Sequence, residues 1–399
     1  MGIRVAIVDD NPHLAWGGRT YPANATFEHF VAALLDLPGS PVASIVSCVP
    51  LRPAEAEPAT RPLDPRIEVA GTAPFDGIEG YLRSLPSMLR TNRPVLRRAI
   101  READLVWIRV PGSNALMATM LAAAGGTPRF AWVAGSAMRV AAARFDGPRR
   151  VAGLLVGAGY DIVGRAAGLG GDHVVVGRDL VAADGSPGDG LVASLVELAE
   201  IVDPSSMPAI GGMDGLRLSW AGRLVDGKGL EALIEALASM PTGRLTLVGD
   251  GPARAPLAAL AANLGLAGRV EFTGHVADRT AYLRHLADSD LFVFPSPAEG
   301  FPKVILDAAA IGLPIIASAS GSLDELTLAG VVMPVDAGSA TSIAGAIGRL
   351  AGDADEIARL RAAGHALALA HTRGAEAARL VARWQARWPA LSWAPLGPR

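Results

Sequence analysis

Short runs of β-branched and other apolar residues alternate along the chain with longer stretches rich in alanine and leucine. Brief apolar runs are typical of strands buried on both faces of a parallel sheet, and their alternation with helices is typical of an α/β fold. In the first half the pattern predicts strands at 4–8, 44–49, 67–70, 105–109, 130–133 and 173–176. It predicts helices at 27–37, 115–124 and 149–166.

A segment rich in proline, glycine and serine, DPSSMPAIGGMDG at 203–215, has the composition of an interdomain linker. A second α/β series follows it, with predicted strands at 216–221, 244–248, 270–272, 291–295, 314–317 and 330–334. Helices are expected between them at 230–238, 253–264, 281–287, 304–310 and 340–350. The tail carries a helical stretch at 373–388, with Trp384 and Trp388 on one face.

The pattern therefore predicts two doubly wound domains that face each other across a cleft, where open α/β sheets bind ligands. We expect an N-terminal domain at 1–202, the linker at 203–215, a C-terminal domain at 216–372, and a final segment at 373–399 whose helix crosses back to the first domain.

Composition agrees with a chain that builds large cores: of 399 residues, 50% are apolar and 19% are charged. Lysine and arginine number 36 against 39 acidic residues, so the net charge is −3, which argues against a general nucleic-acid partner. Cys48 is the only cysteine, which excludes a disulfide framework and a cysteine-based zinc site within one chain.

No targeting segment is predicted, because the first apolar run, 5–8, stops at an aspartate pair. The longest mostly apolar stretch, 304–319, contains Asp307 and Pro314 and is shorter than the ~20 residues of a membrane span. Together with the lone cysteine, these features favour a cytoplasmic location.

The first motif with candidate chemistry is GRLVDGKG at 222–229, between a predicted strand and a predicted helix. It nearly matches an ATP-binding P-loop, but Gly229 stands where a serine or threonine would hold magnesium. Alternatively, Arg223 and Lys228 hold an anion near a helix N-terminus, or they are surface charges on an ordinary turn.

Two further loops follow predicted strands of the same sheet. Gly249-Asp250-Gly251-Pro252 suits a close backbone approach to a ligand, or a plain strand-to-helix turn. The segment PSPAEGFPKVILD at 295–307 places Glu299 after a buried strand and Asp307 eight residues later in an apolar helix. The intervening amides and the two carboxylates suit sugar hydroxyls and phosphate oxygens. The plainer alternative is that Glu299 caps the helix and Asp307 pairs with a nearby cation.

From about 216 to 370 the chain resembles the nucleotide-sugar domain of the family 4 glycosyltransferases, which are retaining enzymes of the GT-B fold. The matching pieces are GRLVDGKGLEALIEAL, LTLVGDGP, VEFTGHV, DSDLFVFPSPAEGFPKVILDAAAIGLPIIAS and SGSLDEL, followed by GVVMPVDAGSATSIAGAI. Their order and spacing match together, which is far more specific than any single piece. The expected fold class is therefore α/β GT-B, with two Rossmann-like domains.

The resemblance implies roles for the matched positions. Arg223 and Lys228 would grip the donor diphosphate, and Glu299 would lie beside the reacting carbon of the sugar. The remaining donor pocket would be formed by Gly222, Gly249, Asp250, Gly251, His275, Val276, Gly300, Phe301, Pro302, Lys303 and Val304. Asp307 takes the place of the family's usual ribose-binding glutamate and is one methylene shorter.

The N-terminal half resembles the family in outline only. Gly17 and Gly18 match its glycine pair near the donor phosphate and acceptor. Many members carry a histidine after a middle strand of the acceptor domain, but here FAWVAGSAMRV has Gly135-Ser136 and no histidine.

The resemblance implies a retaining, metal-independent transferase that moves a sugar from a nucleotide-diphosphate sugar to an acceptor hydroxyl, in carbohydrate or natural-product biosynthesis. No bound cofactor is expected beyond the donor substrate. Two alternatives remain: a nucleotide-sugar 2-epimerase, and a catalytically silent nucleotide-sugar binding module.

Three other features have plainer interpretations. Asp288-Ser289-Asp290 resembles an Asp-x-Asp metal site but precedes a strand, so it is interpreted as a helix end; Asp9-Asp10 is interpreted as a turn. A basic stretch carries arginines at 83, 90, 93, 97, 98 and 101. It would touch an anionic membrane if the acceptor is a lipid, although a solvated helical surface is the preferred interpretation.

Overall fold

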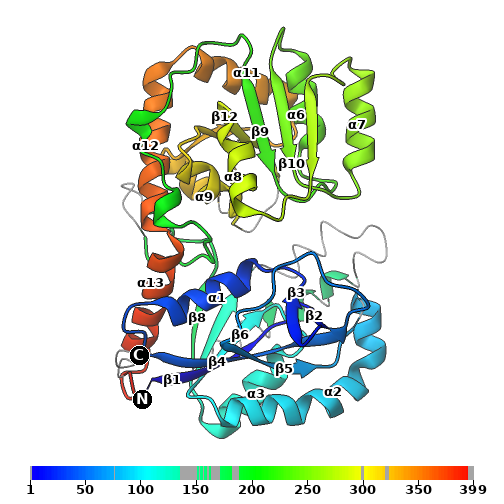
Figure 1. Ribbon diagram of the computed structural model, residues 1–399, viewed down its shortest axis with the longest axis vertical. Coiled ribbons are helices and arrows are strands. Elements are labelled where there is room, and N and C mark those ends of the chain that lie inside the picture. Colours follow the sequence, from blue (N-terminus) through cyan, green and yellow to red (C-terminus); the bar gives the residue numbers. More distant parts are fainter. Residues whose placement is uncertain are drawn as a thin grey trace. The chain divides into compact units, whose positions relative to one another are not determined.

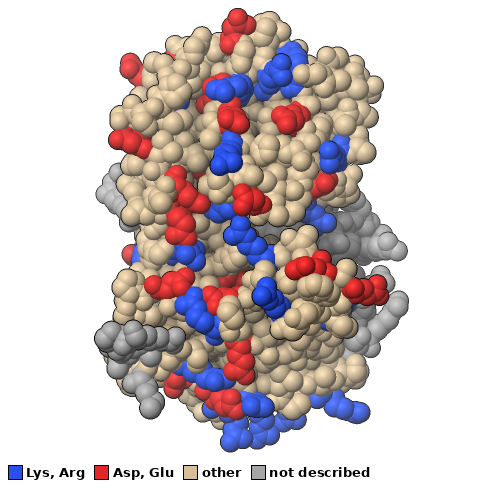
Figure 2. Space-filling view, viewed as in Figure 1, with Lys and Arg blue, Asp and Glu red and all other residues tan. Residues whose placement is uncertain are grey.

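The chain forms two compact units (Figure 1): unit 1 comprises Met1–Val176 with Gly374–Arg399, and unit 2 comprises Gly177–Arg373. The computed structural model describes residues 2–75, 77–134, 151, 153–155, 157–159, 161–162, 171–181, 188–297, 301–319 and 323–393, with backbone only for 77–85. Each unit is described by itself. Acidic and basic side chains are interspersed on the face shown in Figure 2, as the near-zero net charge of −3 suggests.

Unit 1 is built on an eight-stranded sheet in the order β3-β2-β4-β1-β6-β7-β8, with β5 also paired to β4. The strands are β1 Ile3–Val8, β2 His13–Trp16, β3 Arg19–Pro22, β4 Val42–Pro53, β5 Ile67–Thr72, β6 Leu105–Val110, β7 Arg129–Val133 and β8 Asp172–Val175. All pairs are parallel except β2 with β3. The six strands expected from the apolar runs are confirmed, because each run is long enough to cross a buried sheet.

The helices that flank this sheet include α1 Thr26–Asp36, α2 Gly77–Arg101, α3 Ala115–Gly125 and, from the far end of the chain, α13 Arg373–Arg387. Trp384 of α13 is fully buried, with its ring 5.6 Å from that of Trp107 and 5.7 Å from that of Phe130. The tail helix therefore completes the core of unit 1. Described residues between 151 and 162 are helical, whereas half of the predicted helix at 149–166 lies outside the described residues.

In this unit the sequence interpretation missed the antiparallel hairpin of β2 and β3, and in the second half of the chain it missed the helices at 323–328 and 354–370. Gly17 and Gly18 form its two-residue turn with φ values of 57° and 75°. Two successive left-handed residues are typical of a type I′ turn, whose twist matches that of the flanking strands.

Unit 2 contains a six-stranded parallel sheet in the order β11-β10-β9-β12-β13-β14. Its strands are β9 Arg217–Ala221, β10 Arg244–Val248, β11 Val270–Gly274, β12 Leu291–Phe294, β13 Ile315–Ser318 and β14 Val332–Val335. Its helices are α6 Leu230–Ala238, α7 Arg254–Asn263, α8 Arg279–Ala287, α9 Val304–Ala310, α10 Leu323–Leu328, α11 Ala340–Ala351 and α12 Ala354–Ala370. The predicted strands and helices of this half are all present.

The units divide at Val176, whereas the sequence placed the domain boundary after 202. The segment before the expected linker is held within unit 2 by backbone bonds, including Gly177 N–H to Leu191 O at 2.9 Å and Val202 N–H to Ala310 O at 2.7 Å. The expected linker contains a short 3-10 helix, η2 Pro204–Ser206. Its Pro208 carbonyl accepts a hydrogen bond from Arg361 at 3.0 Å. Among the described residues, no helix is both long and apolar enough to cross a membrane.

Candidate functional site

The strand order of unit 2 marks one place where two neighbouring loops diverge. The chain runs from β9 through β10 to β11 on one side of β9, and then returns to β12 on the other side. The loops after β9 and β12 leave the sheet in opposite directions, and the crevice between such loops is the usual ligand site of open α/β sheets. These loops carry the residues that the sequence singled out.

The loop after β9 is shaped by glycines that no other residue can replace without strain. Gly229 has φ 72°, and a Cβ at this position would lie 2.4 Å from the carbonyl oxygen of Pro295, just after β12. A serine or threonine would be strained at this position, so the structure explains why the loop departs from the P-loop pattern there. Helix α6 begins directly afterwards, at Leu230.

The two cations of this loop flank the tight turn. Arg223 is exposed and forms no hydrogen bond or ion pair with any residue in the described part of the chain. Lys228 is half-buried next to Gly229. A guanidinium and an ammonium beside the N-terminus of a nine-residue helix suit an anionic ligand.

The loop after β10 interlocks with the loop after β9. A Cβ on Gly249, which has φ 143°, would meet the carbonyl oxygen of Gly222 at 1.9 Å, and a Cβ on Gly251 would meet that of Leu224 at 2.1 Å. Leu224 N–H donates to the carbonyl of Asp250 at 3.0 Å. The glycines therefore serve first to pack backbone against backbone, which gives the sheet edge a fixed shape.

The loop after β11 joins the same edge through a bridge between Gly249 and Gly274. His275 follows as an exposed residue and Val276 is half-buried. Asp250 is also exposed, and its carboxylate lies 3.5 Å from Arg254 of α7. The loops after β11, β10 and β9 thus follow three neighbouring strands of the sheet.

The loop after β12 is described in part. Glu299 and Gly300 lie outside the described residues. Phe301 is half-buried and packs so closely on Gly177 that no Cβ would fit there, and Pro302 is buried. Lys303 and Val304 are half-buried at the start of α9.

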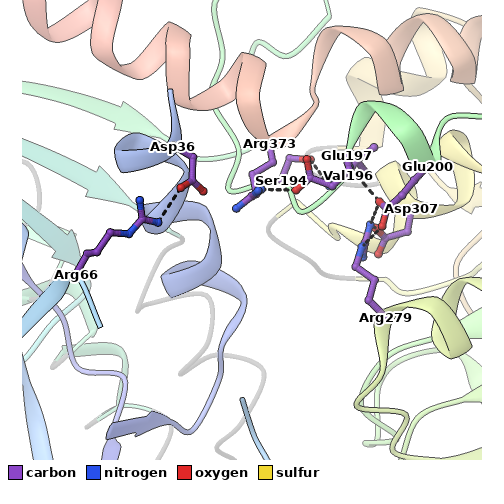
Figure 3. A network of polar contacts seen from close by, with 9 residues as sticks. All are labelled: Asp36, Arg66, Ser194, Val196, Glu197, Glu200, Arg279, Asp307 and Arg373. Atoms are coloured by element: carbon purple, nitrogen blue, oxygen red, sulfur yellow. Dashed lines mark hydrogen bonds and ion pairs between the residues drawn. The ribbon is translucent and has the colours of Figure 1, made fainter. Parts of the chain in front are cut away.

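Asp307 lies in a buried network that the sequence interpretation only partly anticipated (Figure 3). Its two carboxylate oxygens accept from Arg279 Nη2 at 2.9 Å and from the Tyr282 hydroxyl at 3.1 Å. Arg279 also donates to both oxygens of Glu200, at 2.7 Å each. Burial raises the pKa of Asp307, and the Arg279 charge opposes this effect. The pairing with a nearby cation, which was the plainer alternative, is therefore observed.

Unit 1 has a corresponding switch point, between β1 and β6, and it is lined with charged side chains that the sequence interpretation missed. Asp9 after β1 accepts from Arg109 of β6 at 2.6 Å, and Asp10 accepts from the Ser113 hydroxyl at 2.7 Å. Asp9-Asp10 is thus a cross-strand anchor rather than only a turn. The sequence feature that could have predicted this ion pair is the arginine within the otherwise apolar run LVWIRV, since a charge in a buried strand needs a partner.

Glu28 and His13 lie behind these aspartates, buried in the same unit. Glu28 accepts from Asn11 at 2.6 Å, and its other carboxylate oxygen has no partner among the described residues. Burial, helped by the charge on Asp9, raises the pKa of Glu28 to about 7. Burial likewise raises the pKa of Asp10 to about 6, against the hydrogen bonds from Ser113.

The remaining candidates of the first half are separate from this cluster. Gly17 and Gly18 form the exposed hairpin tip, with open space beside both Cα atoms. Gly135-Ser136 lies outside the described residues.

Asp288-Ser289-Asp290 is confirmed as a helix end, since Asp288 follows α8 and Asp290 pairs with Arg217 at 2.7 Å. Within the described ranges, no group of three or more metal-binding side chains gathers.

Solved structures with the same architecture define the class. The sucrose-phosphate synthase of Thermosynechococcus elongatus superposes with a TM-score of 0.64 at 17% identity, covering 98% of this chain and all of that one. The HepE protein of Anabaena, solved in complex with UDP, gives 0.62 at 15% identity, covering 96% and 100%. The fold is α/β with Rossmann-like units, in the GT-B class.

Sequence comparisons show which protein family the second half of the chain resembles. Residues 215–353 match the family model of the group 1 glycosyl transferases. The chain is 34% identical over 189 residues to the lipopolysaccharide core biosynthesis glycosyltransferase LpsE of Rhizobium meliloti, covering 47% of this chain and 52% of LpsE.

A second relative is a GDP-mannose-dependent α-(1-6)-phosphatidylinositol monomannoside mannosyltransferase of Mycolicibacterium smegmatis, 35% identical over 175 residues, or 40% of this chain and 46% of that one. The chain matches about half the length of these curated relatives. The resemblance seen in the sequence is confirmed: residues 215–353, within unit 2, match the group 1 glycosyl transferases.

Proposed function

We propose that the chain is a retaining glycosyltransferase that moves a sugar from a nucleotide-diphosphate sugar to an acceptor hydroxyl. One observation carries the proposal: Arg223 and Lys228 stand at the switch point of the unit 2 sheet, on a loop whose glycines fix its shape. The relatives named above, which are glycosyltransferases, and the UDP complex of a protein with the same fold support this choice of donor.

The two cations stabilise the departing diphosphate. Negative charge builds on this group as the bond to the anomeric carbon breaks, and fixed positive charges nearby lower the barrier. Arg223 offers a planar fork of donors and Lys228 a point charge, a combination suited to neighbouring phosphates. We assign no metal to this step, because the side chains supply the positive charge; chelation with EDTA should then leave turnover unchanged.

The other loops bind the rest of the donor. We place the sugar against Glu299 and the amides of Gly300 to Val304, and the nucleobase against His275 and Val276. Asp307 is the candidate for the ribose hydroxyls. Because each of its oxygens already accepts one hydrogen bond, a ribose contact would use its remaining acceptor capacity.

Retention follows from attack on the same face that the diphosphate leaves. The acceptor oxygen bonds to the anomeric carbon as the bond to the phosphate oxygen breaks, and that phosphate oxygen takes the acceptor proton. The motif supplies one carboxylate beside the sugar, Glu299, whereas a double displacement needs a nucleophile and a separate acid–base group. For the acceptor we propose the carboxyl edge of the unit 1 sheet, where Asp10 can accept a hydrogen bond from a hydroxyl.

The test measures release of nucleoside diphosphate from a panel of nucleotide sugars, with and without candidate acceptors. Lys228→Ala and Arg223→Ala should each lower the rate about 10²–10³-fold. Arg244→Ala is the matched control, because Arg244 is exposed at the opposite, amino end of β10 and should leave the rate unchanged.

Glu299→Gln should abolish transfer while donor binding persists. Near-wild-type turnover of Lys228→Ala would refute the assignment. Conversion of donor alone into its epimer would favour the 2-epimerase, and donor binding without turnover would favour the silent module.

A further inference from the structure

Helix α2 presents a row of arginines to solvent. Arg90, Arg93, Arg97 and Arg101 recur at spacings of three and four, so they share one face over three turns, roughly 16 Å. All four are exposed, and none forms an ion pair with a residue in the described ranges. Arg98 flanks the row, 79% exposed, and shares Glu102 with Arg4.

The opposite face of the helix packs against the core of unit 1, and these arginines take no part in that packing. Met88, Leu96 and Ile100 are buried, and Leu96 and Ile100 belong to a core cluster with the alanines of α3. The exposed row does not contribute to that packing. Its like charges at spacing four, Arg93 with Arg97 and Arg97 with Arg101, repel each other and oppose helix formation.

We propose that this face of α2 docks unit 1 on an anionic lipid bilayer. Rows of arginine beside aliphatic side chains fit a surface that offers phosphate groups above a hydrocarbon layer. Leu89 is 47% exposed next to Arg90, and on the neighbouring helix α3 Leu116 and Met120 are 49% and 63% exposed. Figure 2 shows basic side chains gathered along the lower edge of this unit, where α2 and α3 lie in Figure 1.

The same helix is a poor match for nucleic acid. Residues 86–101 contain no aromatic side chain on which a base could stack. A hollow of about 570 Å³ is lined by Pro94, Arg97, Arg98, Arg101 and Glu102, which mixes cations with an acidic side chain. A single lipid phosphate can avoid Glu102, whereas a continuous phosphate backbone along the row would pass it.

The test is flotation of the full chain with vesicles of phosphatidylcholine, with or without phosphatidylglycerol. The wild type should bind only the anionic vesicles, and added salt should release it. The variant Arg93→Gln/Arg97→Gln/Arg101→Gln should bind roughly a hundredfold more weakly, since each basic side chain near an anionic surface contributes about a factor of five.

The control is Arg244→Gln/Arg284→Gln/Arg349→Gln, three exposed arginines of unit 2. Both triple variants lower the net charge from −3 by three, to −6, so the control separates position from total charge. Retained binding of the control supports the proposal.

Failure of the wild type to float, equal loss in both variants, or tighter binding to single-stranded RNA than to the anionic vesicles would overturn the proposal. Circular dichroism would establish that both variants are folded. None of these results depends on glycosyl transfer.

Discussion

At the scale of single residues, the candidate site depends on positions where side chains are excluded as much as on those that carry charge. Gly229 and Gly249 each sit with positive φ against a neighbouring carbonyl oxygen. The fit leaves Arg223 and Lys228 on a loop that cannot easily change shape. In unit 1, burial opposes the negative charge of two carboxylates, Asp10 and Glu28, and raises the pKa of each.

Replacement of Gly229 tests its close approach to the carbonyl oxygen of Pro295. Gly229→Ala should destabilise the chain more than Gly227→Ala, because both residues have left-handed φ values, 72° and 80°, but only Gly229 faces an atom within 4 Å. The left-handed backbone alone costs about 1–2 kcal/mol in each variant. Urea unfolding of the two proteins measures the difference, and equal losses would contradict the contact with Pro295.

Glu28 should make stability depend on pH. Its pKa is raised from 4.5 to about 7 by burial and by Asp9, so the folded chain holds the proton more tightly than the unfolded chain. The stabilisation is complete below pH 4.5 and is lost as the pH rises through 7, to a limit of about 3 kcal/mol. Glu28→Gln should therefore gain stability relative to wild type between pH 5 and pH 8.

Melting temperatures at the two pH values provide the measurement for this prediction. Glu55→Gln changes an exposed carboxylate of the same unit, so its melting temperature should depend on pH in the same way as that of wild type. If the melting temperature of Glu28→Gln depends on pH in the same way as that of wild type, Glu28 is not protonated in the folded chain at neutral pH.

At the scale of elements, Arg279 ties three segments of unit 2 together. From the start of α8 it reaches Glu200 of the short helix η1 Leu198–Glu200 and Asp307 of α9. Glu197, three residues before Glu200, pairs with Arg373 at 2.5 Å. Residues 197–200 of unit 2 are thereby tied to α8 and α9 (Figure 3).

Removal of Arg279 should destabilise unit 2 strongly. Arg279→Ala leaves two poorly solvated carboxylates facing each other, and breaking such a pair typically costs about 3–5 kcal/mol. Arg284→Ala, on the same helix and exposed, should change the melting temperature little. Equal effects of the two variants would show that the network contributes nothing beyond surface charge.

The strands of unit 2 were predictable because each is a short apolar run, and the loops after β9, β10 and β12 begin with glycine or proline. Helices α10 and α12 were not predicted. The hairpin β2–β3 was also within reach: HLAW and RTYP flank Gly17-Gly18, a pair that favours a type I′ turn. The partners of Asp307 were out of reach. Arg279 and Tyr282 are 28 and 25 residues away in sequence, and only the fold brings them to Asp307.

At the scale of the whole molecule, the chain returns to its first unit at the end. The tail pattern placed Trp384 and Trp388 on one helical face, and the structure buries Trp384 completely and Trp388 only in part. The domain boundary was less predictable, because the polar segment at 203–215 has a linker's composition although hydrogen bonds hold it to unit 2.

Trp384→Ala should destabilise unit 1 by about 3–5 kcal/mol, since it opens a cavity beside Trp107 and Phe130. Trp388→Ala should cost less than about 1 kcal/mol, because its side chain remains partly in solvent. Limited proteolysis and melting of the two variants distinguish them. A Trp384→Ala protein as stable as Trp388→Ala would mean that α13 adds little to the core of unit 1.

The central claim is that the loop after β9 holds the diphosphate of a sugar donor. The most direct measurement is a crystal structure of the full chain with a bound nucleotide-diphosphate sugar. We expect phosphate oxygens on Arg223 and Lys228 and the sugar beside Glu299. A donor bound elsewhere, or those two side chains turned away from the phosphates, would contradict it.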